Sequence, residues 1–203
     1  MPPSDNDKKS FFDHHAGRWD KTNYRGEQSA RIGPLVMDLN LKPGAKVLDV
    51  GCGTGVLTPH ILRVVGPKGL VVGLDVSPKM VRQATEKGFA ENARFVEGDV
   101  ERAPFADGYF DAVLCFSAFP HFDDQQRALR EMHRVLAAGG SLFVFHLEGS
   151  ELINSFHHGY GGPVKHDRLP AGPQMASMLG SKGFGLVKVT DKQDLYWAYG
   201  KKI

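Results

Sequence analysis

The stretch that decides the fold is Val47-Leu48-Asp49-Val50-Gly51-Cys52-Gly53-Thr54-Gly55, where a short apolar strand runs into a loop with glycine at every second position. A predicted helix follows at Val56-Leu57-Thr58. Glycine lets a backbone turn sharply and approach a ligand without a Cβ clash. The start of a helix presents unpaired N–H groups and a partial positive charge. Strand, loop and helix together therefore predict a ligand cradle.

The composition is that of an ordinary globular protein. The chain has 203 residues, which favours one domain over 1–203, and 41% of them are hydrophobic. The net charge of +2 argues against a nucleic-acid partner. The two cysteines, Cys52 and Cys115, make neither a disulfide framework nor a cysteine-based metal site, and we expect no bound metal. No apolar run approaches the roughly 20 residues that cross a bilayer, so we expect a cytoplasmic protein without a membrane span.

Hydrophobic periodicity predicts the fold class. Apolar strands are predicted at 46–50, 70–75, 93–97, 109–116 and 141–146. Predicted helices separate them at 58–65, 78–87 and from residue 123 or 124 to 138. Strands that are apolar throughout and alternate with helices are typical of a parallel sheet covered on both faces. We therefore expect an α/β fold with a doubly wound, mostly parallel sheet.

The flanking segments are less regular. Residues 1–9 are polar and terminal, which predicts disorder. Residues 10–41 are interpreted as N-terminal lid helices, the second of which, at 31–41, would carry Pro34 in its first turn. The first of them could equally pack its aromatic residues at the domain edge, and the two interpretations are compatible.

The C-terminal third is predicted in two parts. Residues 148–171 lack a clear period and contain several glycines and prolines, so we expect a long substrate-side loop with one helical turn around 151–156. Residues 172–203 are predicted to form a closing helix and an antiparallel hairpin. The hairpin edge could pair with a second copy or be covered by the N-terminal helix, which leaves a homo-oligomer possible.

Two acidic residues follow predicted strands beside the glycine loop. Asp75 ends the second strand and Asp99 follows the third, and ligands of such sheets bind at the carboxyl ends of the strands. A dinucleotide fingerprint would place glycine where Val56 stands. Asp75 suits the ribose hydroxyls of a dinucleotide and equally those of a nucleoside ligand without phosphates. Asp99 suits the amino group of adenine, and it would be a poor neighbour for phosphates.

These residues resemble the motifs of the class I S-adenosylmethionine-dependent methyltransferases, closest to the subgroup that methylates quinones and other small molecules. The resemblance covers about 46–144, with five motifs in the expected order at 47–55, 73–80, 98–105, 110–117 and 131–140. It implies a Rossmann-like seven-stranded sheet, a cofactor-binding core at 46–147 and S-adenosyl-L-methionine as cofactor. It also implies a small-molecule acceptor.

The resemblance assigns cofactor contacts residue by residue. Asp49 and the glycine loop would approach the methionine portion, Asp75 the ribose and Asp99 the adenine amino group. Met80 would pack against adenine, although simple core packing is an alternative for it. The full set implied is Asp49, Gly51, Cys52, Gly53, Gly55, Asp75, Val76, Met80, Gly98, Asp99, Val100, Phe116 and Ser117.

Histidines are the candidates for catalysis and for acceptor binding. His121 follows the fourth strand and could accept a proton or orient an acceptor at neutral pH, with a packing role as the alternative. His146, His157, His158 and His166 gather after the fifth strand, where they could contact substrate, bind a metal or have only a structural role. The predicted acceptor-binding residues are Trp19, Tyr24, His121, His146 and His157.

Three functions remain open from the sequence. The first is methyl transfer by in-line displacement to a small molecule, where catalysis is largely positioning. The second is a nicotinamide-dependent oxidoreductase, disfavoured by Val56 and Asp99. The third is a protein that binds S-adenosylmethionine without catalysis.

Overall fold

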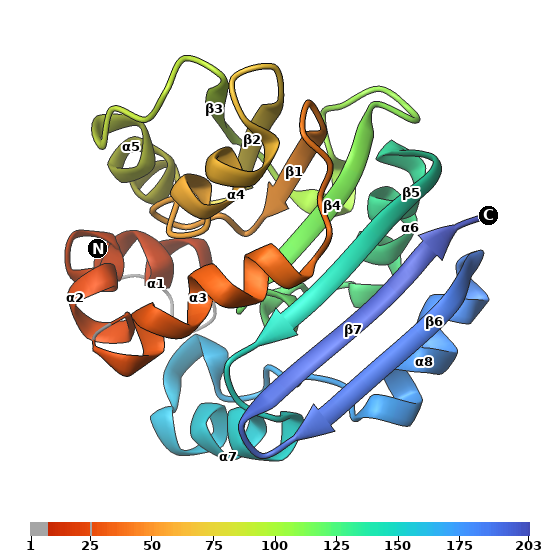
Figure 1. Cartoon of the computed structure of the whole chain (residues 1–203). Helices are drawn as coiled ribbons and strands as arrows, with labels where there is room; N and C mark the ends of the chain where they lie inside the picture. Colours follow the sequence, from red (N-terminus) through yellow and green to blue (C-terminus); the bar gives the residue numbers. More distant parts are fainter. Residues whose placement is uncertain (1–7, 25) are drawn as a thin grey trace.

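The computed structural model describes residues 8–24 and 26–203, and its centre is a seven-stranded sheet (Figure 1). The order is β3-β2-β1-β4-β5-β7-β6, and β7 runs antiparallel to both of its neighbours while the first five strands pair in parallel. The predicted α/β, doubly wound, mostly parallel sheet with a C-terminal antiparallel strand is confirmed. The strands are β1 Lys46–Val50, β2 Leu70–Asp75, β3 Ala93–Glu97, β4 Phe110–Phe116, β5 Leu136–His146, β6 Phe184–Lys192 and β7 Leu195–Lys202.

Helices cover both faces of the sheet. On one face, α3 (Glu27–Asp38) and α4 (Thr58–Val65) bury apolar side chains against β1 and β4. On the other face, α6 (Gln125–Val135) and α8 (Gly172–Ser181) pack against β4, β5 and β7. Helix α5 (Pro78–Glu86) lies against β2 and β3. Two apolar layers explain why the central strands read as continuous hydrophobic runs.

The N-terminal helices lie beyond the carboxyl ends of the central strands, on the same side as α7 (Figure 1). They are α1 (Lys8–His15) and α2 (Trp19–Asn23), separated by a single 3₁₀ turn, and α7 spans Ser150–Tyr160. No helix in the described part of the chain is long and apolar enough to span a bilayer.

The prediction of a long loop at 148–171 was wrong, because α7 fills most of its first half. The helix begins where the Asp191 carboxylate accepts hydrogen bonds from the Ser150 backbone N–H at 2.9 Å and from the Ser150 hydroxyl at 2.6 Å. Asp191 lies on β6 and satisfies N–H groups that a helix start leaves unpaired. This cap comes from 41 residues away, so no local pattern could show it.

Three smaller boundaries also differ from prediction. Helix α3 begins at Glu27, which places Pro34 inside it rather than in its first turn. Pro34 has no N–H to donate to the carbonyl of Ala30, four residues earlier in the helix. Because Ala30 is exposed, water can donate to that carbonyl instead. Lys8 and Lys9, predicted as disordered, belong to α1, and the remainder of that prediction, 1–7, lies outside the described residues.

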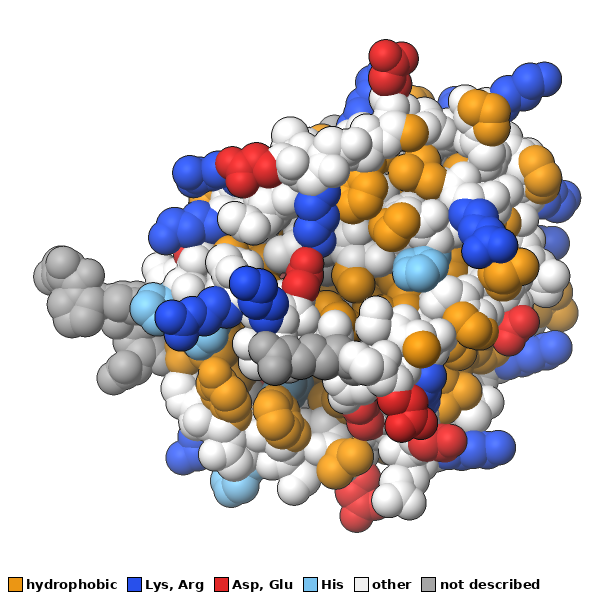
Figure 2. Space-filling model, turned by 60° about the vertical axis from the view of Figure 1, so that its left-hand side comes forward, with side chains coloured by type: hydrophobic (Ala, Val, Ile, Leu, Met, Phe, Trp, Pro, Cys, Tyr) orange, Lys and Arg blue, Asp and Glu red, His pale blue; other side chains and the backbone are white. Residues whose placement is uncertain are grey.

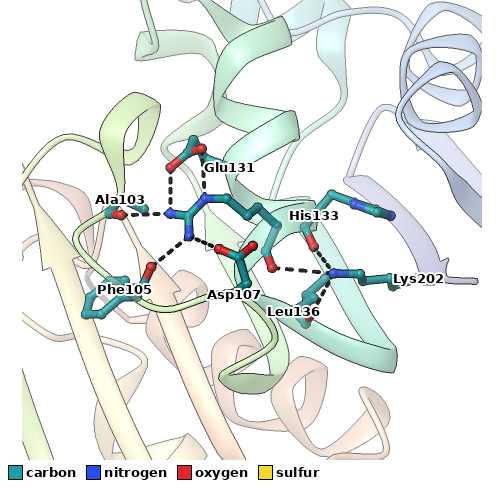
Figure 3. A network of polar contacts seen from close by, with 8 residues as sticks. Ala103, Phe105, Asp107, Glu131, His133, Leu136 and Lys202 are labelled. Carbon is teal, nitrogen blue, oxygen red and sulfur yellow. Dashed lines mark hydrogen bonds and ion pairs between the residues drawn. The ribbon is translucent and has the colours of Figure 1, made fainter.

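The third difference is at the end of α6, which stops at Val135, so that β5 begins at Leu136 instead of 141. Two cations hold this junction, as Figure 3 shows. The Lys202 ammonium binds the carbonyls of His133 at 2.8 Å and of Leu136 at 2.7 Å. The Arg134 guanidinium binds carboxylates and carbonyls on the other side, namely those of Glu131, Asp107, Ala103 and Phe105.

The surface carries both signs of charge. On the face shown in Figure 2, lysine and arginine side chains are scattered among acidic and hydrophobic ones and form no continuous basic area.

Candidate functional site

A cavity of about 250 Å³ lies at the carboxyl ends of β1, β2 and β4. The glycine loop forms one wall, and Gly51 and Gly53 have φ angles of 66° and 53°, in the left-handed region that favours glycine. A Cβ on Gly51 would lie 2.3 Å from the Cβ of Ala118. The loop can therefore lie this close to the segment after β4 only because residue 51 is a glycine.

Asp75 ties the loop to the end of β2. Its two carboxylate oxygens accept hydrogen bonds from the backbone N–H groups of Gly53 at 2.8 Å and Ser77 at 2.9 Å. Burial raises the pKa of Asp75, and these two hydrogen bonds act in the opposite direction. The carboxylate is thus held in place at the cavity wall.

Asp49 is the buried acid of the site. Its side chain is 1% exposed, and its Oδ2 has no hydrogen-bond partner within 8–24 and 26–203. Burial, with a smaller contribution from the charge of Asp75, raises the pKa of Asp49 to about 8. A buried acceptor without a partner is costly, and a cationic ligand group would satisfy it. Asp49 therefore fits the ammonium end of an amino-acid ligand.

Another part of the cavity wall combines buried apolar side chains with an acid. Met80 is buried at the start of α5, where its N–H donates to the hydroxyl of the capping Ser77 at 3.1 Å. Val100 is also buried beside it, and Asp99 accepts a hydrogen bond from the backbone N–H of Glu101 at 2.8 Å. An apolar surface with an exposed carboxylate at its edge suits a flat base that carries an amino group.

The structure brings all the predicted cofactor-binding residues except Gly55 to this one cavity. Gly55 is buried behind the loop, with φ of 77°, and a Cβ there would lie 3.1 Å from the ring of Phe89. Its place is in the turn rather than in the cavity wall. Other wall residues were not among the predicted ones, some because they come from distant segments and some although they stand inside or beside the motifs: Lys8, Lys9, Phe12, Thr54, Leu57, Glu101, Ala118, Phe122 and Asp123.

A second cavity, of about 1040 Å³, adjoins the first. All five predicted acceptor-binding residues line it, and much of the remaining wall is apolar or aromatic, from α1, α7 and the turn after α7. The side chains common to both cavities are Phe12, Trp19, Tyr24, Ser117 and His121. Apart from His157, sequence reasoning did not select the residues that α7 contributes to the wall, because only one turn of that helix was predicted; they are Leu152, Ile153, Phe156 and Tyr160.

His121 stands at the junction and is held by an acid. Its Nδ1 lies 2.6 Å from the Oδ2 of Asp167, which is 6% exposed. Lys8 of α1 reaches the other oxygen of Asp167 at 2.8 Å. Burial alone would raise the pKa of Asp167, but the hydrogen bonds from His121 and Lys8 outweigh it and hold that pKa below its ordinary range.

The other predicted histidines divide into two groups. His146 is 2% exposed, and burial, together with the nearby His121 and His157, lowers its pKa to about 3, so that it is neutral at physiological pH. His157 donates from Nδ1 to the carbonyl of Asp167 at 3.1 Å. His158 and His166 are exposed and line neither cavity. Within the described residues, no group of three or more histidine, cysteine or acidic side chains is arranged to hold a metal ion.

The N-terminal helices are attached above the site by polar contacts. Asp13 accepts hydrogen bonds from the hydroxyl of Ser77 at 2.5 Å and from the N–H of Lys79 at 3.2 Å. Asp20 accepts one from the hydroxyl of Thr54 and forms an ion pair with Lys87 at 2.7 Å. These contacts lie at chain separations above 30 residues and join α1 and α2 to the glycine loop and to α5.

Comparison with known proteins agrees with this geometry. A family model described as a methyltransferase domain, Methyltransf_11, matches residues 48–144. Residues 48–144 are thus similar to a methyltransferase domain. The Asp49 oxygen that has no partner among the described residues, and the glycines of the loop, are suited to S-adenosylmethionine as a cofactor.

Two curated relatives are similar to this chain over a little more than half of its length. The chain is 41% identical over 118 residues to the ubiquinone/menaquinone biosynthesis C-methyltransferase UbiE of Hahella chejuensis, covering 56% of this chain and 47% of that protein. It is 37% identical over 126 residues to UbiE of Ectopseudomonas mendocina, covering 59% and 49%. The chain thus spans about half the length of the curated relatives it matches.

A solved structure extends the similarity of fold to nearly the whole chain. The S-adenosylmethionine-dependent methyltransferase from Aquifex aeolicus superimposes with a TM-score of 0.76 at 21% identity, covering 93% of this chain and 98% of that one. At this identity the likeness concerns the fold alone.

Proposed function

We propose that this protein transfers a methyl group from S-adenosylmethionine to a small molecule held in the second cavity. The observation that carries the proposal is the meeting of the two cavities at Ser117 and His121, at the carboxyl end of β4. When bound, the cofactor supplies a methyl carbon on a positively charged sulfur that departs with its bonding electron pair. Catalysis then depends largely on how the chain positions an acceptor against that carbon.

The chain's own residues supply binding and orientation for the cofactor. Asp49 would accept from the cofactor's ammonium group, and Asp75 from the ribose hydroxyls. Asp99 would accept from the adenine amino group, whose ring would lie between Met80 and Val100. Phe116 and Ser117 would border the methyl group. The arrangement of these side chains around one cavity supports the assignment.

The acceptor's size and polarity are proposed from the second cavity. Aromatic and aliphatic side chains from α1, α2 and α7 form much of its wall, beside polar ones such as Arg18 and Glu148, which suits a small molecule with an apolar body rather than a protein or a nucleic acid. The relatives' names, which specify C-methylation in quinone biosynthesis, support a small-molecule acceptor. The buried Cys52 and Cys115 are free thiols, which supports a cytoplasmic location.

Calorimetric titration tests the cofactor part of the proposal. S-adenosylmethionine and its demethylated product, S-adenosylhomocysteine, should both bind at one site per chain, and Asp75→Asn should weaken both. NADH serves as the matched competitor, because a nicotinamide-dependent oxidoreductase would prefer it. Binding of NADH in place of both sulfur nucleotides would contradict the proposal.

Turnover needs a second experiment. The protein is incubated with methyl-labelled S-adenosylmethionine and a metabolite extract, and labelled products are separated by chromatography. Methyl transfer predicts label in at least one small molecule that a sample without protein lacks. Tight binding without label in any fraction would favour a protein that binds the cofactor without catalysis.

A further inference from the structure

The pair formed by His121 and Asp167 is placed where a proton could leave an acceptor. His121 lines both cavities, and Asp167 lies behind it, buried, with its Oδ2 at 2.6 Å from Nδ1 of the ring. A carboxylate can only accept, so the Nδ1 of His121 carries the proton of this hydrogen bond. In the neutral ring, Nε2 is then the acceptor.

Asp167 is itself held from several sides, as a positioning residue requires. Its N–H donates to the carbonyl of Val164 at 3.0 Å, and its carbonyl accepts from Nδ1 of His157 at 3.1 Å. The neighbouring carbonyl, of Arg168, accepts from the Gln125 side chain at 2.8 Å. The carboxylate therefore fixes the orientation of the His121 ring, and the chain around Asp167 fixes the carboxylate.

Two other buried histidines line the second cavity beside His121. His157 lies with its ring centroid 4.9 Å from that of His121, and burial lowers the pKa of His157. The buried His146 also lines the second cavity. The titratable and charged groups that contact or electrostatically influence His121 from the surrounding elements are Asp167, Lys8, His157, His146 and Asp75.

His146 adds a polar anchor to the same cavity. Its Nε2 is buried and has no hydrogen-bond partner in the described part of the chain. A neutral imidazole can offer either a donor or an acceptor to a ligand. A wall that is in large part aromatic and aliphatic, with this buried unpaired nitrogen among its polar groups, suits an acceptor with an apolar body and a hydroxyl group.

We propose that His121, oriented by Asp167, removes a proton from the acceptor, and that the acceptor is an apolar molecule with a weakly acidic O–H. This inference rests on the proposed methyl transfer. The O–H bond breaks, its proton passes to Nε2 of His121, and its electron pair stays with the acceptor, where it makes the nucleophile. The imidazolium formed is stabilised by the Asp167 carboxylate and later returns the proton to solvent.

Lys8 adds a link between this pair and the N-terminal helix. It bridges Asp167 at 2.8 Å and Asp123 at 2.9 Å, and it donates to the carbonyl of His121 at 3.0 Å. The packing of α1 therefore places a positive charge at Oδ1 of Asp167, while His121 binds Oδ2. Asp123 shares Lys8 but makes no contact with the His121 ring, so it provides the matched control.

The first test measures which ring nitrogen of His121 carries the proton, by nitrogen-15 NMR at neutral pH with S-adenosylhomocysteine bound. The wild type should show the form protonated on Nδ1. Asp167→Asn should lose the preference, Asp167→Glu should retain it in part, and Asp123→Asn should leave it unchanged. The same ring state in the wild type and in Asp167→Asn would overturn the proposal.

The second test uses 4-nitrophenol, whose ionised form absorbs visible light, with nitrobenzene as the probe that lacks O–H. In the saturated complex with S-adenosylhomocysteine, the ionised fraction of bound 4-nitrophenol should exceed that in buffer by about tenfold at the same acidic pH. His121→Asn and Asp167→Asn should abolish the excess. An excess that survives in both variants would overturn the proposal.

Binding of S-adenosylhomocysteine by each variant separates this inference from the proposed function. If the nucleotide binds every variant equally and the His121 readouts do not change, the proton-transfer pair fails while methyl transfer stands. If the wild type binds no sulfur nucleotide, the proposed function itself fails.

Discussion

Replacing Asp49 with asparagine should remove a pH dependence from the stability of the fold. In the native state burial raises the pKa of Asp49 to about 8, from an ordinary value of 3.8. Between these two values the unfolded chain has lost the proton and the native chain has kept it. The free energy of unfolding therefore falls as pH rises, by about 1.4 kcal/mol per pH unit from this one group.

The size of this pH effect follows from the one proton by which the native and unfolded chains differ. From pH 5 to pH 7 the free energy of unfolding of the wild type should fall by about 3 kcal/mol because of Asp49. Asp49→Asn should lack this part of the fall. Other groups also titrate in this window, including His146 and His157, so the informative quantity is the difference between the two proteins. Urea unfolding at pH 5, 6 and 7 measures it.

An exposed carboxylate supplies the control for this measurement. Asp38→Asn, at the end of α3, should leave the pH dependence of the wild type in place. If the curves of wild type and Asp49→Asn run parallel between pH 5 and 7, Asp49 is ionised in the empty fold and the reasoning from burial is refuted. A companion titration should show wild type, and not Asp49→Asn, releasing a proton when S-adenosylhomocysteine binds at pH 7.

Three further substitutions test contacts that build the site or hold the fold around it. Gly51→Ala should cost about 2 kcal/mol and weaken S-adenosylhomocysteine binding at least tenfold in calorimetry, because its Cβ would lie 2.3 Å from that of Ala118. Arg134→Met should lower the free energy of urea unfolding by about 2 kcal/mol, since it breaks the charged hydrogen bonds at the end of α6. Asp191→Ala should speed hydrogen exchange in α7, because it removes the cap at Ser150. Adding Ala118→Gly to Gly51→Ala should restore part of the lost stability and binding. Arg130→Met, at an exposed position of the same helix, is the control for Arg134→Met. Unchanged hydrogen exchange in α7 of Asp191→Ala would contradict the prediction for that variant.

The regular part of the fold follows from local signals. The central strands are apolar along their whole length, and each helix between them carries an apolar stripe, so the sequence alone predicts a covered parallel sheet. The glycine loop follows the first predicted strand, Asp75 ends the second and Asp99 follows the third. Parallel strands bring their carboxyl ends to one edge, which is why nearly all the predicted cofactor-binding residues meet at one cavity.

Only the tertiary structure decides the acceptor side. Helix α7 depends on Asp191 of β6 for its start, and the end of α6 depends on Lys202 of β7. The pairing of Asp167 with His121 joins residues 46 apart through an unpatterned turn, and Lys8 reaches the same acid from 159 positions away. A sequence pattern reports the period of each element and the residue types at its ends. It carries no information on which distant side chain will satisfy a given buried polar group, because packing of the whole chain determines that choice.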